Sequence, residues 1–133
     1  MDISKIEGIG PVYAKQLKHA GINNTAGLLR VAADKRGRQE LAEKTNLSEK
    51  LILEWVNLAD LMRVKGIGEE YSDLLEEAGV DTVKELRNRV PENLHKSVLE
   101  TNAKKNLVRR PPSLSMVQRW VSHAKRLDPI VTH

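Results

Sequence analysis

Two parts of the chain repeat each other, and this internal repeat constrains the fold more than any other feature. The segment Ile6-Glu-Gly8-Ile-Gly10-Pro-Val-Tyr13 returns 58 residues later as Val64-Lys-Gly66-Ile-Gly68-Glu-Glu-Tyr71. The positions that follow keep the same offset: Leu17, Ala20, Gly21, Ile22 and Leu28 in the first copy, and Leu75, Ala78, Gly79, Val80 and Leu86 in the second. Recurrence of this kind indicates one supersecondary unit used twice.

The resemblance between the copies continues beyond the glycines, at a larger offset. Residues 48–59 match residues 113–124 at an offset of 65, so the second copy carries a seven-residue insertion. The insertion is expected within 101–112, where a basic segment ending in Pro111-Pro112 interrupts the helical pattern. We therefore predict two repeats, residues 1–63 and 64–133, with the basic Pro-Pro segment in the second.

Helix signals recur through both copies, and no segment shows the period-two alternation of a strand. Helix starts are predicted by Pro11, Asn24, Asp34, Thr82 with Glu85 as a capping box, Pro91, and Ser48, which caps the longest helix. Gly21 and Gly79 stand where a left-handed residue ends a helix. Tyr13, Tyr71, Trp55 and Trp120 are expected in the core. The predicted fold class is all-α, with two tandem units packed as one compact body.

Composition narrows the class of protein. The 133 residues include no cysteine, which excludes disulfides and cysteine metal sites. No apolar stretch is long enough to cross a membrane, so we expect a cytoplasmic protein without a membrane partner. The four histidines are far apart, and the common catalytic motifs are missing, so we predict no enzyme activity, no metal site and no cofactor.

The two glycine segments resemble the helix-hairpin-helix motif, in which Val64-Lys-Gly66-Ile-Gly68 joins a long helix to a second one beginning near Glu69. In the first copy only Met1–Lys5 precede the hairpin, so its first helix is expected to be short or to be supplied from elsewhere in the fold, for example by the C-terminal helix. The whole chain also resembles a bacterial family of unknown function built from tandem helix-hairpin-helix units. The wider superfamily implies that hairpin glycines offer backbone N–H groups to DNA phosphates without reading the sequence.

The charges around the two hairpins differ. Gly8, Ile9 and Gly10 are followed by Lys15 and Lys18, and no acidic residue occurs from Gly8 to Ala33, so this hairpin is suited to holding a phosphate. The second hairpin is followed by Glu69 and Glu70, which satisfy the helix dipole themselves and repel an anion. We expect the second hairpin to serve packing.

Basic residues gather again toward the C-terminus. No acid occurs between Thr101 and Leu127, and this tract supplies the further candidate contacts Arg109, Arg110, Arg119, Lys125 and Arg126. A smaller cluster is formed by Lys35, Arg36 and Arg38. Together with the first hairpin these residues predict a phosphate-tracking surface, if folding places them on one side.

The first functional hypothesis is non-enzymatic, sequence-nonspecific binding of duplex or single-stranded DNA. A second is a protein-interaction or scaffolding domain, in which the acidic helix 69–77 and the basic segment 104–126 meet complementary partners or a second copy. A third is an accessory subunit that places a nuclease or polymerase on DNA. The sequence leaves the oligomeric state open.

Overall fold

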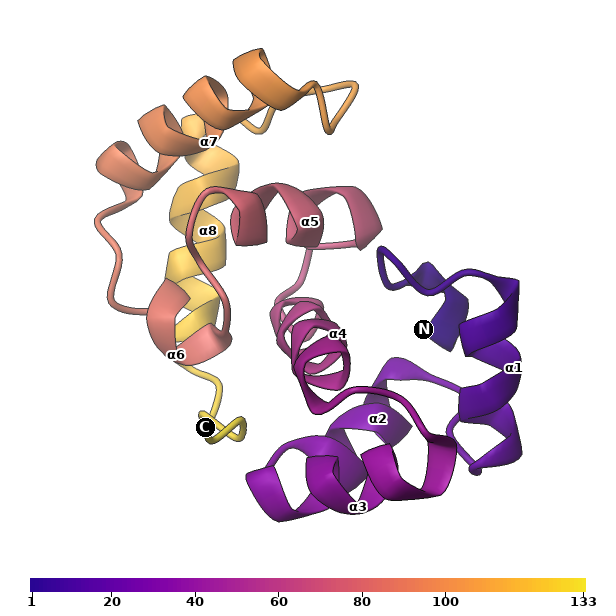
Figure 1. The fold of residues 1–133 in the computed structure, drawn as a ribbon. Coiled ribbons are helices and arrows are strands. Elements are labelled where there is room, and N and C mark those ends of the chain that lie inside the picture. The colour runs from indigo at the N-terminus through magenta and orange to yellow at the C-terminus, as the bar shows by residue number, and fades with distance from the viewer. The chain divides into compact units, whose positions relative to one another are not determined.

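The computed structural model describes all residues, 1–133, and shows eight α-helices, one short 3₁₀-helix and no strand. This confirms the predicted all-α class. The chain divides into two compact units: unit 1 comprises Met1–Asp60 with Ile130–His133, and unit 2 comprises Leu61–Pro129. Figure 1 shows the helices of each unit along the chain. None of them has both the length and the apolar composition needed to cross a membrane.

Unit 1 begins with the 3₁₀-helix η1 (Ile3–Lys5), so the element before the first hairpin is short. It continues with α1 (Pro11–His19), α2 (Thr25–Ala32), α3 (Lys35–Thr45) and α4 (Glu49–Leu61). Three predicted caps are present, because Asn24 accepts from Gly27 N at 2.7 Å, Asp34 from Gly37 N at 2.7 Å, and Ser48 from Leu51 N at 3.1 Å. Gly21 ends the α1 segment with a φ of 88°. The local signals therefore set most helix boundaries here.

A buried arginine, Arg38, joins the end of α2 to the C-terminal residues of unit 1. Arg38 in α3 is only 4% exposed, and its guanidinium donates to the carbonyl oxygens of Ala32 at 3.1 Å, Ala33 at 2.8 Å and Thr132 at 2.6 Å. Burial lowers the pKa of Arg38. The expectation that Arg38 belongs to a basic surface cluster is therefore wrong: its head group ties the C-terminal residues to the end of α2.

Unit 2 contains α5 (Glu69–Glu77), α6 (Val83–Leu86), α7 (Pro91–Lys105) and α8 (Leu114–Ala124). Helix α7 packs on α8 and on α5, and α6 packs on α8. Ser113 caps α8 by accepting from Met116 N at 3.2 Å. The unit surrounds one apolar core, whose fully buried members include Leu74, Leu75, Val83, Leu86, Leu94, Val98, Val117 and Ala124.

Two local predictions for the helices need correction. Thr82 precedes α6 and is buried at 6% exposure, but its side chain makes no cap bond; Glu85 accepts from Asp81 N at 3.4 Å rather than from Thr82 N. The longest helix is α7 rather than α4. Eight residues (106–113) join α7 to α8 where three (46–48) join α3 to α4, which places extra chain in the expected region.

Candidate functional site

Hairpin 1, residues 6–10, presents free backbone donors at the start of α1. Gly10 is the N-cap and provides no side-chain cap, while Pro11 has no N–H. The first helical bond runs from Ala14 N to Gly10 O at 2.9 Å. The N–H groups of Gly10, Val12 and Tyr13 consequently have no protein acceptor and point outward from the positive end of the helix.

The two glycines of hairpin 1 have different physical roles. Gly8 has a φ of 89°, and a Cβ there would lie 3.6 Å from the indole nitrogen of Trp55. Gly10 has an ordinary φ of −82°, and a Cβ there would meet no atom within 4 Å. Gly8 is therefore required by the turn itself, whereas the space beside Gly10 is open to an approaching molecule.

Lysines from α1 lie beside this open face. Lys15 and Lys18 line a shallow depression with Gly10 and Pro11. Lys15 is exposed. Lys18 lies 3.6 Å from Asp2, an acidic residue that precedes the acid-free stretch from Gly8 to Ala33. The Ser4 hydroxyl and backbone N–H, assisted by Lys18, lower the pKa of Asp2. Asp2 thus offsets part of the positive charge near the hairpin.

Ile9 lies differently from the two glycines. Its side chain is 5% exposed, and its N–H donates to Ile6 O at 3.1 Å. Ile9 therefore holds the hairpin to the core of unit 1, and the outward donors are those of its neighbours.

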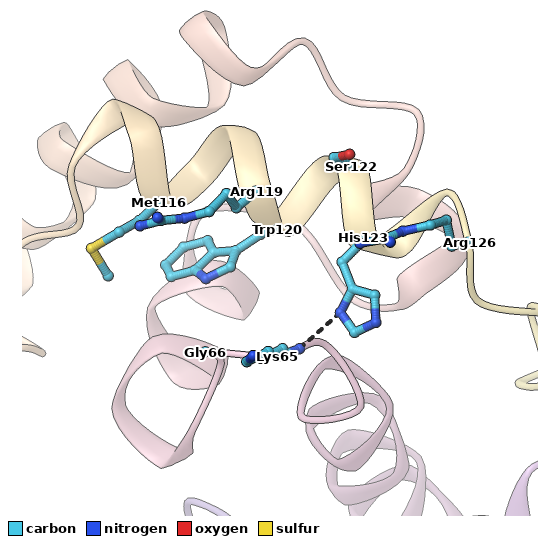
Figure 2. A pocket seen from close by; sticks show the side chains of 8 residues that line it. All are labelled: Lys65, Gly66, Met116, Arg119, Trp120, Ser122, His123 and Arg126. Atoms are coloured by element: carbon cyan, nitrogen blue, oxygen red, sulfur yellow. Dashed lines mark hydrogen bonds between the residues drawn. The ribbon is translucent and has the colours of Figure 1, made fainter.

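Hairpin 2, residues 64–68, lies under α8. Lys65 N donates to His123 Nδ1 at 3.0 Å, and Gly66, with a φ of 94°, would place a Cβ 3.1 Å from the indole nitrogen of Trp120. Figure 2 shows Trp120 and His123 directed from α8 toward the Lys65–Gly66 turn. A cavity of about 460 Å³ lies between them, and Arg119 and Arg126 also line it. Two of the predicted basic residues thus gather at hairpin 2.

The remaining predicted residues also belong to unit 2. Arg109 and Arg110 are exposed in the α7–α8 loop, and the Tyr71 hydroxyl donates to Arg110 O at 2.8 Å. Lys125 is exposed just after α8, and its carbonyl accepts from Arg87 at 3.2 Å. The candidate residues therefore form two groups: the hairpin 1 residues with Lys15 and Lys18 in unit 1, and the five from the C-terminal tract in unit 2.

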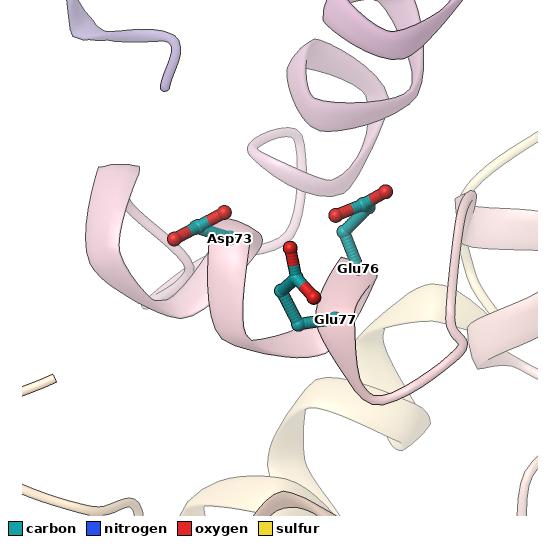
Figure 3. A group of neighbouring side chains, drawn as sticks. All are labelled: Asp73, Glu76 and Glu77. Carbon is teal, nitrogen blue, oxygen red and sulfur yellow. The ribbon is translucent and has the colours of Figure 1, made fainter. Parts of the chain in front are cut away.

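Three carboxylates gather on α5, as Figure 3 shows. Oxygens of Asp73, Glu76 and Glu77 lie within 4.8 Å of one another. Lys105 at the end of α7 forms an ion pair with Glu77, whose hydrogen bond and charge raise the pKa of Lys105, with Glu76 and Asp73 adding to the effect. The Lys105 ammonium group therefore links the end of α7 to the carboxylates of α5.

Sequence reasoning missed Lys65 as part of a site. Its signal lies in a comparison of the two copies, because Lys65 stands where the first copy has Glu7, and Arg119 stands where it has Glu54. Both positions reverse charge on the same scaffold. Glu69 and Glu70, which follow hairpin 2 in the sequence, predict a negative surface there, although Lys65 precedes its glycines.

The fold and the two hairpins define an all-helical protein with a glycine turn in each of two units. The family model described as a domain of unknown function (DUF4332) matches residues 7–127, and the chain belongs to this family. No curated protein matches the chain, and no solved structure matches it.

Proposed function

We propose that this protein consists of two tandem helix-hairpin-helix repeats and that it binds DNA without sequence preference and without catalysis. Hairpin 1 provides the backbone contacts, while Lys15 and Lys18 supply charge on the same face. The basic residues of unit 2, Arg109, Arg110, Arg119, Lys125 and Arg126, extend the phosphate contacts along the strand. Phosphate-directed contacts of this kind position a protein on DNA but carry no base readout.

The open space beside Gly10, next to the exposed Lys15, is the observation that carries the proposal; Gly68 of hairpin 2 has the same open space but is followed by Glu69 and Glu70. Neither the backbone dihedral nor internal packing explains a glycine at this position, because an alanine fits there without strain or contact. A phosphate that accepts from the N–H groups of Gly10, Val12 and Tyr13 would approach through the space that a Cβ obstructs. The exposed Lys15 then lies one turn further along α1.

Fluorescence anisotropy with labelled duplex and single-stranded DNA tests this function across a salt series of about 50–200 mM. We expect the logarithm of the affinity for duplex to fall with the logarithm of salt, with a slope of about 0.9 for each phosphate neutralised. Lys15→Glu/Lys18→Glu should weaken binding. Lys44→Glu/Lys50→Glu is the matched control, because it changes the net charge equally at exposed positions of unit 1 that lie outside the predicted phosphate contacts.

The outcome that contradicts the proposal is equal loss in both double variants, which would reduce the effect to net charge. Absence of binding at about 50 mM salt would contradict it as well. A protein-interaction domain remains the second candidate, based on the acidic α5 and the basic tract. Because Lys105 already pairs with Glu77 inside unit 2, part of that complementarity is used within the chain. A mass that rises with protein concentration in sizing experiments would favour this second function.

A further inference from the structure

The cavity between hairpin 2 and α8 has the size and lining of a small-molecule site. Its volume of about 460 Å³ falls within the range of about 300–1,000 Å³ that ligand pockets occupy. Gly66, Trp120 and the half-buried Met116 supply apolar walls, and no carboxylate lines the cavity. Apolar walls with a few polar groups are the usual composition of such a site.

Three cations surround this cavity. Lys65 lies at the hairpin, Arg119 lies on α8, and Arg126 lies in the turn that follows α8. All three side chains are exposed, and none forms an ion pair with an acid of the protein. Because unpaired like charges around one cavity repel one another, an anion bound among them relieves that repulsion.

His123 adds a hydrogen-bond donor to the same wall. Its Nδ1 accepts from Lys65 N at 3.0 Å, so the proton of the neutral ring resides on Nε2. Arg119 and His123 lie four residues apart on α8 and Arg126 follows in the turn after the helix, and all three line the cavity (Figure 2). The hydrogen bond that fixes the ring therefore also determines which nitrogen donates.

The first copy of the repeat shows that the scaffold does not require these cations. At the offsets of the repeat, Lys65 corresponds to Glu7, Arg119 to Glu54, and Arg126 to Leu61. Unit 1 nevertheless places Trp55 over its own hairpin glycine, as unit 2 does with Trp120. Packing of the tryptophan against its hairpin glycine therefore does not require the three cations around the cavity of unit 2.

We infer that this cavity binds a nucleotide. Lys65, Arg119 and Arg126 hold the phosphate, and the base lies against Met116 and Gly66, beside the buried ring of Trp120. An inorganic anion would leave the apolar walls uncovered, and an uncharged base would leave the three cations uncompensated. A free mononucleotide and the phosphorylated end of a DNA strand share this chemistry. The site is separate from hairpin 1, but it shares Arg119 and Arg126 with the phosphate contacts proposed above, so the test relies on variants of hairpin 1 to distinguish the two.

Nuclear magnetic resonance titration of the full chain with dAMP tests the site. We expect dAMP to shift the amide signals of Lys65 and Gly66 and the indole N–H of Trp120. Deoxyadenosine and inorganic phosphate, each lacking one half of the ligand, should bind about tenfold more weakly, the equivalent of about 1.4 kcal/mol. Lys65→Glu/Arg119→Glu should weaken dAMP binding at least as much. This variant places in unit 2 the residues that unit 1 has at the same positions.

Controls separate this site from the proposed duplex contact. Lys15→Glu/Lys18→Glu should lose duplex binding and keep dAMP binding. If Lys65→Glu/Arg119→Glu loses its helical circular dichroism, Lys65→Gln/Arg119→Gln replaces it. Unchanged dAMP binding in a folded variant, absence of the three shifts, or inorganic phosphate binding as tight as that of dAMP would overturn the inference. Tighter binding of a 5′-phosphorylated oligothymidylate would support the site with a strand end as its ligand, and weaker binding would support it with the free nucleotide.

Discussion

The indole nitrogen of Trp120 lies 3.1 Å from the point where a Cβ on Gly66 would stand, so the last helix of unit 2 closes directly over its own hairpin. Trp55 has the same relationship to Gly8 in unit 1, at 3.6 Å. Each tryptophan also packs on a tyrosine of the helix that follows its hairpin. The ring centroids are 5.1 Å apart for Tyr13–Trp55 and 5.2 Å apart for Tyr71–Trp120. The orientation of each hairpin is therefore set by aromatic packing within its unit.

Gly66 and Gly68 should respond very differently to alanine. Gly66→Ala forces a side chain into a φ of 94° and against Trp120, so we expect a loss of about 1–3 kcal/mol in the free energy of unfolding. Gly68→Ala meets no atom and has a φ of −105°, so it should change stability by less than about 0.5 kcal/mol. Chemical denaturation measures both, and equal losses would contradict this division of roles.

Gly10→Ala should separate binding from stability at hairpin 1. The added methyl group has open space, so the unfolding free energy should stay within about 0.5 kcal/mol of wild type. If a phosphate approaches this face, affinity for duplex should fall about tenfold, as expected for the loss of one charge-assisted hydrogen bond. Gly68→Ala is the matched control in hairpin 2. Full affinity in Gly10→Ala would remove the main support for a phosphate contact there.

Much of the fold could be predicted because its signals are local. Asn24, Asp34 and Ser48 bond to backbone N–H groups a few residues away, so a short stretch of sequence contains the whole cap. Thr82 fits the same pattern but is buried and makes no side-chain cap bond. Burial depends on residues distant in the chain, which a local motif does not reveal.

The candidate sites were harder to predict because folding brings together charged residues that are far apart in the sequence. Asp2 reaches Lys18, and α8 brings Arg119 beside Lys65, although each hairpin's own neighbours indicate the opposite balance. Arg38 looks like a surface cation until its three carbonyl partners are seen, one of them 94 residues away. Comparison of the two copies, position by position, was the one sequence signal for the charges at hairpin 2.

The ion pair between Lys105 and Glu77 should give unit 2 a stability contribution that disappears at high pH. The pair raises the pKa of Lys105 above its ordinary 10.5, so the contribution is fully present below that value and is lost as pH rises through the higher folded pKa. Titration of the Lys105 Cε carbon signal should show the raised pKa, and Glu77→Gln should lower it. An unchanged pKa in Glu77→Gln would contradict the assigned cause.

The Tyr71 hydroxyl should restrain the α7–α8 loop. Tyr71→Phe removes its bond to Arg110 O and should lower the unfolding free energy by about 0.5–1 kcal/mol. Amide hydrogen exchange across residues 107–112 should become faster. Tyr13→Phe is the control in unit 1, because the Tyr13 hydroxyl has no protein partner. Equal exchange in wild type and Tyr71→Phe would contradict this role of the hydroxyl and leave the loop to other restraints, such as the bond from Val108 N to Asn102 Oδ1 at 2.9 Å.

Among alanine substitutions of basic residues in unit 1, Arg38→Ala should lower the free energy of unfolding the most. It leaves the carbonyls of Ala32, Ala33 and Thr132 without their shared donor, so we expect a loss of about 3 kcal/mol in unfolding free energy. Arg36→Ala, two residues earlier, removes only the exposed pair with Glu40 at 3.2 Å and should change stability by less than about 0.5 kcal/mol. Urea denaturation of both variants measures the difference. Arg38→Lys should recover only part of the loss, because one ammonium group does not reproduce the planar fork that spans the three oxygens.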